Sequence, residues 1–451
     1  MSNATHTALP AGTVEKDWVA IKRLFRAGSG VQPPLMAGRE SEMNTFAEIL
    51  EDLQEEAEME GDVVLFGPRG NGKTVLLDRF RAACREAGVA TLALDPSEIN
   101  DPGALALELL KSPHFPDADG LPATDKPILN RIGNAARRVT EVVSEAGRQT
   151  LPEAGTLHVS GVQAGVSGAK LTLEQMSPER LAAALRPLLA ERCRQRPLMV
   201  TLDEAHTLDE EVGRRLLNLS QHLRTTDKVP FLLALAGTPN LRVHLSAIGS
   251  TFWTRATKLG IGRISEAATR EALIEPLEPH GVTFSEDALA TVVAESQQYP
   301  YFIQVWGKAL CKALVEQGCQ RIDADTVAAA GSAFEEERTD YYADRYNELE
   351  KQKLLPVART VTGLFAQAPK WDRTALKERL CADLSLEEDD ALNAIQHLAH
   401  LGYLWEDYGK DLMEPGIPSL MSYVGERLGR PAPDVAPMPE EPEPDPPGFN
   451  R

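Results

Sequence analysis

A glycine-rich loop constrains the fold of this chain more than any other feature. It follows a short apolar run over residues 62–66 and precedes a helical pattern over residues 74–87. Glycines allow successive backbone N–H groups to curl around an anion, and the helix N-terminus adds a partial positive charge. The order of strand, loop and helix therefore predicts a phosphate-binding turn at the end of a buried strand. The residues of the loop are Gly67, Pro68, Arg69, Gly70, Asn71, Gly72, Lys73 and Thr74.

The loop predicts roles for its last two residues and a nucleoside triphosphate as its ligand. Its spacing fits G-x-x-x-x-G-K-[ST], in which Lys73 reaches the β- and γ-phosphates and Thr74 ligates Mg²⁺ through its hydroxyl. A chance glycine turn is the alternative, and the correct flanking elements disfavour it. We expect all eight loop residues to bind ATP, and Thr74 to ligate Mg²⁺ as well.

Two adjacent carboxylates complete the predicted site. The apolar run of residues 198–202 predicts a strand, and Asp203 and Glu204 follow it directly. Asp203 is placed to hold Mg²⁺ through water, and Glu204 can polarise an attacking water molecule. Both roles are needed, since phosphoryl transfer relies on positioning and electrostatics. Asp-Glu-Ala-His also spells a helicase box, but no second motor domain follows residue 260.

Three further runs complete the predicted sheet and its cover. Residues 90–94 and 231–236 read as strands, and residues 42–60 as a helix. Strands that alternate with helices predict an α/β fold with a parallel sheet. The strand 231–236 would carry Thr238 and Asn240 to the γ-phosphate or the water. A simple strand-to-loop turn is an equally good interpretation of either residue.

The remaining sequence predicts an insertion, a helical part and a tail. Within residues 100–177, the segment 156–173 alternates and reads as a hairpin, either a surface excursion or a partner-binding element. We divide the chain as follows: an extension over 1–32, a nucleotide-binding core over 33–262, a helical lid over 263–348, a second helical unit over 349–430, and an acidic, proline-rich tail over 431–451 that is expected to be disordered. The first 35 residues are expected to extend over the surface.

Composition excludes several classes of protein. The net charge is −20, with 47 basic and 67 acidic residues, which argues against a sequence-independent nucleic-acid coat. The chain has no apolar stretch of the length that a membrane helix needs, and its N-terminus does not resemble a secretory signal. The five cysteines are odd in number and scattered. We therefore expect a reducing, cytoplasmic location.

Taken in order, these motifs give the chain a resemblance to the AAA+ ATPases of the initiator-type branch. That branch includes origin-binding ATPases, transposition ATPases and many bacterial ATP-binding proteins of mobile elements. The resemblance rests on the segment Met-Ala-Gly-Arg-Glu at 36–40, the glycine loop, Val-Thr-Leu-Asp-Glu-Ala-His at 200–206 and Leu-Ala-Gly-Thr-Pro-Asn-Leu at 235–241. It implies a P-loop NTPase parallel sheet (AAA+ core), a helical lid and a C-terminal winged-helix-like domain.

The resemblance also implies further site residues. Val31, Pro33 and Leu35 would lie against the adenine. Arg255 would be an arginine finger that acts on the ATP of a neighbouring subunit, with Arg263 as the rival. The lid resembles the family from residue 299 to 304, but the usual arginine of that helix is missing. Either Gln304 or Lys308 replaces it, or nothing does.

Charge makes the C-terminal unit ambiguous between DNA and protein as its partner. Helices are expected at about 351–367, 372–383 and 386–402, then a wing over 403–413. The third would be a DNA-reading helix, yet it begins with four acids, and residues 351–430 hold ten Lys/Arg against twelve Asp/Glu. DNA-reading helices offer cations and amides instead, so protein docking is slightly favoured. Asn393, Gln396 and His397 keep DNA possible.

The sequence thus indicates an ATP hydrolase that acts on the β–γ phosphoanhydride with Mg²⁺. Its nucleotide state would drive assembly with itself, a protein partner or DNA, in a DNA-transaction, mobile-element or defence system, without a membrane. The alternative is a STAND-like signalling switch or adaptor that works through protein partners and without DNA. Salt-dependent DNA binding that appears only with ATP would favour the first.

Overall fold

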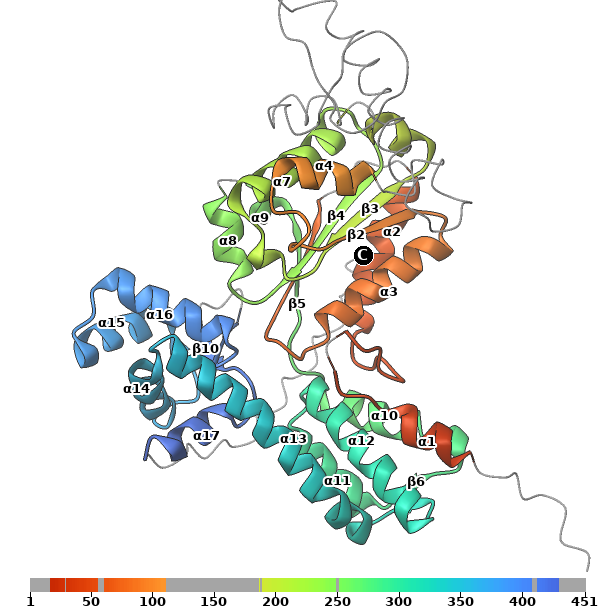
Figure 1. Ribbon diagram of the computed structural model, residues 1–451, viewed down its shortest axis with the longest axis vertical. Coiled ribbons are helices and arrows are strands. Elements are labelled where there is room, and N and C mark those ends of the chain that lie inside the picture. The colour runs from red at the N-terminus through yellow and green to blue at the C-terminus, as the bar shows by residue number, and fades with distance from the viewer. Residues whose placement is uncertain are drawn as a thin grey trace, which may run out of the picture. The chain divides into compact units, whose positions relative to one another are not determined.

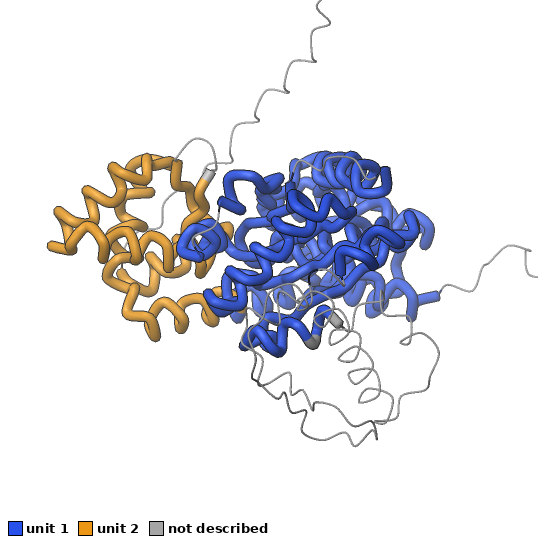
Figure 2. The backbone as a smooth tube through the Cα atoms, turned by 90° about the horizontal axis from the view of Figure 1, so that it is seen from above, with its two compact units in different colours: residues 1–340 blue, residues 341–451 orange. Residues whose placement is uncertain are grey.

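The computed structural model describes most of the chain as two compact units, residues 1–340 and 341–451 (Figure 2). The described residues are 17–28, 30–55, 61–110, 186, 189–248, 251–407 and 412–429. The hairpin expected at 156–173, most of the insertion and the tail from 431 lie outside them. Within them, no helix is both long and apolar enough to cross a membrane.

The first unit is built on a five-stranded parallel sheet in the order β2-β3-β4-β1-β5 (Figure 1). The four strands expected from the sequence are confirmed, and a fifth was not predicted. That strand lies at the sheet edge and reads Thr-Lys-Leu-Gly, with only Leu259 buried, so it lacks the apolar run of the others. The strands are β1 (Val63–Phe66), β2 (Ala90–Leu94), β3 (Leu198–Leu202), β4 (Phe231–Gly237) and β5 (Thr257–Gly260).

Helices cover both faces of this sheet, as the alternating pattern predicted. On one face, α2 (Glu40–Gln54) and α3 (Lys73–Glu86) bury residues such as Phe46, Leu53 and Phe80 against β1, β3, β4 and β5. The Phe46 and Phe80 rings stack with centroids 3.8 Å apart. The other face carries α4 (Pro102–Leu110), α7 (Glu210–Thr225), α8 (Leu241–Ala247) and α9 (Phe252–Arg255) (Figure 1). The apolar strands are therefore buried from both sides.

The rest of the first unit is helical, as expected, apart from two strands of two residues each, β6 (Thr283–Phe284) and β7 (Arg321–Ile322). Its helices are α10 (Glu266–Ile274), α11 (Glu286–Ser296), α12 (Pro300–Gln317) and the start of α13 (Ala324–Lys351), with the 3-10 turn η4 (Glu278–His280). Trp306 and Phe334 stack in the core of this lid with centroids 4.4 Å apart.

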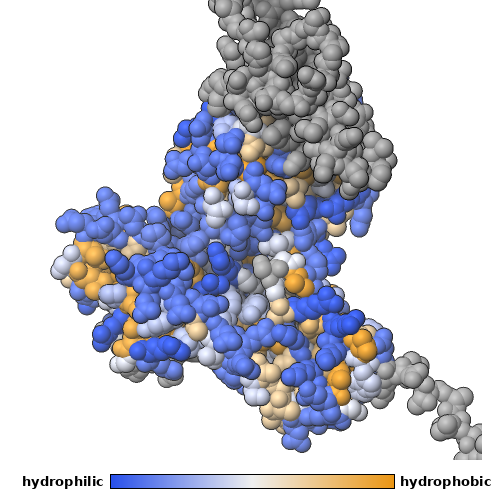
Figure 3. Space-filling view, viewed as in Figure 1, coloured by the Kyte–Doolittle hydropathy of each residue, from blue (hydrophilic) through white to orange (hydrophobic). Residues whose placement is uncertain are grey.

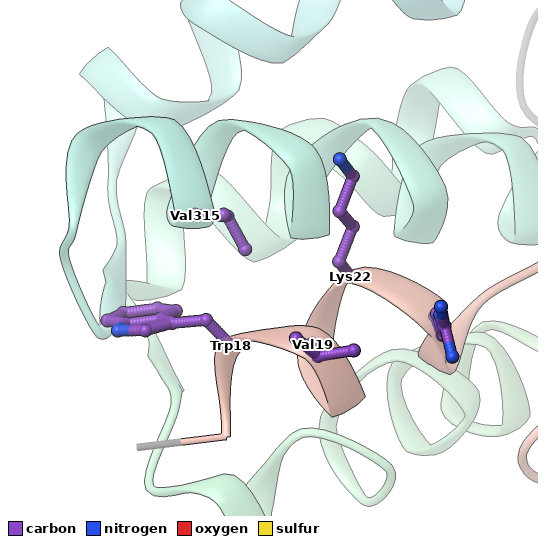
Figure 4. Close-up of a pocket in the computed structure, with 5 residues that line it drawn as sticks. Trp18, Val19, Lys22 and Val315 are labelled. Carbon is purple, nitrogen blue, oxygen red and sulfur yellow. The ribbon is translucent and has the colours of Figure 1, made fainter. Parts of the chain in front are cut away.

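Residues 17–28 of the N-terminal segment pack on the helical part of the first unit, whereas we expected this segment to extend over the surface. Helix α1 (Trp18–Leu24) packs on α12, and Ile21 and Phe25 are buried. A Cβ at Gly307 would lie 2.3 Å from the Phe25 ring, so only glycine accommodates this packing. A shallow pocket between the helices is lined by Trp18, Val19, Lys22, Arg23 and Val315 (Figure 4). The short apolar stretch was too weak a pattern to reveal this helix from sequence.

In the second unit, three helices come first and a pair of antiparallel strands follows them, which is the order that we expected, while the winged-helix assignment stays a prediction. A three-stranded antiparallel sheet, β8-β10-β9, joins its ends. Tyr342 donates a hydrogen bond to the Pro418 carbonyl and ties the end of α13 to this unit. Hydrophilic residues cover most of the described surface visible in Figure 3. The elements are α14 (Leu355–Phe365), β8 (Trp371–Asp372), α15 (Arg373–Leu384), α16 (Glu388–His400), β9 (Leu404–Asp407), β10 (Leu412–Pro415) and α17 (Leu420–Arg427).

Candidate functional site

The glycine loop joins β1 to α3 in a conformation that requires glycine. Gly70 and Gly72 have φ angles of 82° and 87°, in the left-handed region that side chains disfavour. A Cβ at Gly67 would lie 2.2 Å from the Ile261 carbonyl oxygen, so the loop closes tightly on the segment after β5. Helix α3 begins at Lys73, and its N-terminal N–H groups face the loop. The loop thus has the backbone that an anion site needs.

A buried arginine holds the loop from outside. The Nη2 of Arg39 donates to the carbonyls of Asn71 and Gly262, and Asn71 Nδ2 donates to the Ile261 carbonyl at 3.1 Å. Only 7% of Arg39 is exposed, and burial lowers its pKa. In the sequence, Arg39 stands out only as part of the segment 36–40. Its partners are 32 and 223 positions away, so local patterns gave no sign of its role.

Lys73 is buried within the loop and faces its carbonyls. Its Nζ donates to the Gly67 and Pro68 carbonyls, at 2.9 Å each. Burial lowers the pKa of Lys73 to about 8, while the carboxylates of Glu204 and Asp203 oppose this fall and Arg69 adds to it. A phosphate within reach of Nζ would favour the charged form, because an opposite charge stabilises the ammonium.

Thr74 and Asp203 meet although 129 residues separate them in sequence. The Thr74 hydroxyl donates to Asp203 Oδ2 at 2.5 Å, and Asp203 Oδ1 accepts the Glu204 N–H at 2.8 Å. In the sheet, β4 lies between β3 and β1. Because these strands are parallel, the carboxyl ends of β3 and β1 lie at the same end of the sheet, which we call the carboxyl edge. A hydroxyl and a carboxylate side by side fit Mg²⁺, which takes few protein oxygens and completes its shell with phosphate and water. Among the described residues, no group of three or more His, Cys, Asp or Glu side chains forms a metal cluster.

Glu204 stands at the open side of this edge in an unusual backbone conformation. Its φ is 49°, a left-handed conformation that is uncommon outside glycine and that six other described non-glycine residues also adopt. The 3-10 turn η3 (Ala205–Thr207) follows at once and returns the chain beneath Glu204. The Glu204 carboxylate is 44% exposed, and its Oε2 lies 3.8 Å from Arg69 Nη2 and 3.3 Å from His206 Nε2.

The two polar residues after β4 reach the same edge, but differently from each other. Thr238 is fully buried, and its backbone N–H donates to His206 Nδ1 at 3.4 Å. Asn240 is partly exposed and precedes α8, where its carbonyl accepts from His244 N. Of the two, Asn240 is the one whose side chain reaches solvent at this edge.

The two candidate arginines flank the same strand, β5. Arg255 lies where the parallel strands begin, which we call the amino edge, and Arg263 lies where they end, at the carboxyl edge. Strand β5 runs parallel to β1, so that Thr257 pairs with Val63 and Gly260 with Phe66. Arg255 precedes β5, and its carbonyl lies against Gly61 at the amino edge. Arg263 follows β5, next to the Gly262 carbonyl that Arg39 holds. The chain's own glycine loop is thus near Arg263 and a strand length away from Arg255.

The lid contacts the glycine loop through a tyrosine that sequence reasoning did not single out. The Tyr299 hydroxyl donates to the Arg69 carbonyl, and a Cβ at Gly70 would lie 2.7 Å from it. Of the two substitutes for the missing arginine, Lys308 forms a 2.8 Å ion pair with Glu337 on α13. Gln304 Oε1 is buried and has no hydrogen-bond partner in the described part of the chain.

The segment proposed for the adenine lies beside the first turns of α3. Gln32 Nε2 donates to Asp78 Oδ2 at 3.1 Å, and Gly30 lies near the Thr74 methyl group. Its neighbours Val31, Pro33 and Leu35 are partly buried. The segment is therefore close to the glycine loop, as an adenine contact would require.

Comparisons with known proteins agree with this geometry. The family described as AAA ATPase domain matches residues 36–233, which include the glycine loop, Asp203 and Glu204. No curated protein matches the chain. The fold is that of a P-loop NTPase with an AAA+ core, since the parallel sheet, its flanking helices and the loop all follow that plan.

Three solved structures illustrate the likeness. A Walker-type ATPase of Pyrococcus abyssi is 15% identical with a TM-score of 0.52, covering 86% of this chain and 96% of that one. Cdc6p from Pyrobaculum aerophilum is 12% identical with a TM-score of 0.42, covering 89% and 98%. The Orc1 protein of Aeropyrum pernix, solved in complex with DNA, is 16% identical with a TM-score of 0.40, covering 88% and 94%. At such identities the first structure supports the fold alone, and the other two carry no further argument.

Proposed function

We propose that this chain binds ATP with Mg²⁺ and hydrolyses its β–γ phosphoanhydride bond. The observation that carries the proposal is the meeting of Lys73, the Thr74–Asp203 pair and Glu204 at one edge of the sheet. These groups come from β1, α3 and β3. Phosphoryl transfer needs a cation for the phosphates, oxygens for Mg²⁺ and a base for water, and this edge offers each of them.

The chain's own groups divide the work. The loop amides and the N-terminus of α3 bind the phosphates, and Lys73 adds a positive charge. Bound Mg²⁺ would neutralise charge that develops on the phosphate oxygens. Glu204 orients a water molecule and accepts its proton, and the γ-phosphate passes to that water to give ADP and phosphate.

Nucleotide state would reach the lid through Tyr299. Its hydroxyl is bonded to the Arg69 carbonyl inside the loop, so any movement of the loop around phosphates acts on the first turn of α12. Such a link is consistent with an ATPase that changes its assembly with nucleotide. A homo-oligomer or an ATP-dependent protein partner is the assembly that we propose.

Arg255 is proposed to complete a neighbouring subunit's site rather than its own. A strand of four residues spans on the order of 10 Å, and Arg255 lies beyond the far end of β5 from the loop. A finger at the amino edge serves hydrolysis only if a second subunit presents its loop there. Arg263 stays the alternative, since it lies on the loop's own edge.

We infer a setting in a DNA-transaction, mobile-element or defence system of bacteria, in the initiator-type branch, from motif resemblance. The scattered cysteines favour the cytoplasm. A specific observation keeps the STAND-like switch as a second candidate: α16 begins with the exposed acids Glu388, Asp389 and Asp390. Such a helix, although it also exposes Asn393 and His397, repels phosphates and suits a protein partner.

Phosphate release and DNA binding test the two candidates together. The full chain should release phosphate from ATP only with Mg²⁺, and chelation should stop the reaction. DNA binding by fluorescence anisotropy at low salt, with and without ATP, then separates the candidates. ATP-dependent, salt-sensitive binding supports the DNA-transaction setting, and none at low salt supports the switch. A chain that binds no nucleotide would refute both.

A further inference from the structure

We propose that His206 is a positioning residue that orients Glu204 and links it to the end of β4. The proposal rests on the proposed function for its consequence in catalysis, and on contacts within the described residues for its geometry. His206 comes two positions after Glu204, and the turn η3 places it beneath that carboxylate.

The surroundings of His206 fix the ring. Its side chain is only 3% exposed. On one side, Nδ1 accepts the Thr238 N–H at 3.4 Å. Gly237 leaves room for this approach, because a Cβ there would lie 3.2 Å from Nδ1. Any side chain at position 237 would crowd the ring.

The contact with Thr238 determines which nitrogen faces Glu204 with a proton. In a neutral imidazole one nitrogen carries hydrogen and the other accepts. Because Nδ1 accepts the Thr238 N–H, the proton of the neutral ring is on Nε2, and Nε2 lies 3.3 Å from Glu204 Oε2. This contact is within ion-pair distance but lacks the geometry of a hydrogen bond. His206 therefore presents a buried donor that a small movement of the Glu204 carboxylate would engage.

The second neighbour of Glu204 is held far less firmly. Arg69 approaches the same oxygen at 3.8 Å, and its side chain is 41% exposed. Exposed ion pairs are weak because water screens their attraction, and a phosphate in the loop would compete for this guanidinium. His206 thus supplies the constant contact and Arg69 the replaceable one. The backbone strain at Glu204 adds a reason for such support, since a left-handed residue needs its surroundings to hold it.

Two substitutions of His206 test the contacts of its two ring nitrogens separately. In His206→Asn the amide oxygen can still accept from Thr238, but nothing reaches Glu204. In His206→Gln the longer amide can still donate to Glu204. We expect His206→Asn to lower kcat about 10-fold or more, as loss of an outer contact that orients a functional side chain does, with unchanged nucleotide affinity. His206→Gln should retain most of the activity, and His222→Asn, at an exposed position of α7, should behave as wild type.

A double-mutant cycle tests whether the effect passes through Glu204. In a Glu204→Gln background, His206→Asn should change the residual turnover little, because coupled residues are not additive. Full additivity would overturn the proposal, and so would equal losses of kcat in the Asn and Gln variants.

A readout without activity keeps this proposal separate from the proposed function. The ¹⁵N NMR signals of the His206 ring, assigned by their loss in His206→Asn, should show protonated Nε2 and unprotonated Nδ1. Glu204→Gln should shift the Nε2 signal. A proton on Nδ1, or an Nε2 signal that ignores Glu204, would contradict the contact. If those signals agree while the wild-type chain hydrolyses no ATP, the proposed function fails and the positioning contact stands.

Discussion

The two ends of the parallel sheet hold carboxylates in opposite ways, with Asp62 just before β1 and Glu204 just after β3. At the amino end, Asp62 is fully buried, and both oxygens are occupied by Ser220, Arg224 and the Leu233 N–H at 2.8 to 3.0 Å. At the carboxyl edge, the Glu204 side chain is 44% exposed, and its Oε2 lies 3.3 Å from His206 Nε2 and 3.8 Å from Arg69 Nη2. The Asp62 carboxylate at the amino edge is fully hydrogen-bonded, whereas the Glu204 carboxylate at the carboxyl edge can still accept hydrogen bonds from a ligand.

The difference separates a structural carboxylate from the one that we propose to be catalytic. Burial raises the pKa of Asp62, and Arg224, the Leu233 N–H and Ser220 oppose that rise. Asp62 joins α7, β4 and β1 at the edge where Arg255 lies, since Thr257 N also donates to its carbonyl. The same chemical group thus serves the fold at one edge, and we propose that it serves chemistry at the other. Four predictions sharpen or break this contrast, in order of their expected effect on turnover.

The largest fall in turnover is expected for Arg255, which lies at the amino edge and is proposed to act on the ATP of a neighbouring subunit. Arg255→Ala should keep ATP affinity near wild type while turnover falls on the order of 10³-fold, the low end for arginine fingers. Mixing this variant with Lys73→Ala should restore some activity, because a shared interface can then join an intact loop to an intact finger. If the mixture stays inactive with assembly confirmed by light scattering, Arg255 is not a finger in trans, and Arg263 should be tested in the same way.

Glu204→Gln should come next. It should bind ATP normally and turn over at least ~100-fold more slowly, the usual scale for losing a catalytic base. It should also trap any ATP-dependent assembly, visible as a larger species in light scattering. Wild-type turnover in a steady-state phosphate assay would remove Glu204 from the mechanism.

Asp62→Ala should affect stability and spare chemistry. Removing one partner of a buried ion pair leaves Arg224 uncompensated and costs about 3–5 kcal/mol of unfolding free energy. Turnover per folded molecule should stay near wild type below the melting transition. Denaturant unfolding measures the first quantity. A selective loss of turnover in fully folded protein would contradict the contrast between the two edges.

Deleting residues 432–451 should change nothing that either edge does. This segment lies outside the described residues, and its proline and acid content cannot bury enough apolar surface to order it. Melting temperature and phosphate release should match the full chain. A large fall in melting temperature would show that the tail contributes to the fold.

Short local sequence patterns determine how much of the fold and of the candidate site could be predicted. The loop, Asp203 and Glu204 are each defined by a few consecutive residues after an apolar strand, so the sequence alone led to this edge. Strand β5 could not be predicted, because it buries only one side chain and has no apolar run. Arg39 and Tyr299 act on the loop across 32 and 230 residues, and such contacts leave no local periodicity. His206 could be recognised in the sequence as the last residue of the Asp-Glu-Ala-His motif, but its proposed role follows only from the turn that brings it to Thr238.

Nucleotide titration of Lys73→Ala tests the central claim, that this edge binds ATP, most directly. The loop would lose the cation that its carbonyls hold in place at 2.9 Å. A fluorescent ATP analogue should bind the wild-type chain, and the variant should bind it severely more weakly or not at all while its melting curve shows a folded protein. Equal affinity of the two proteins would contradict the account.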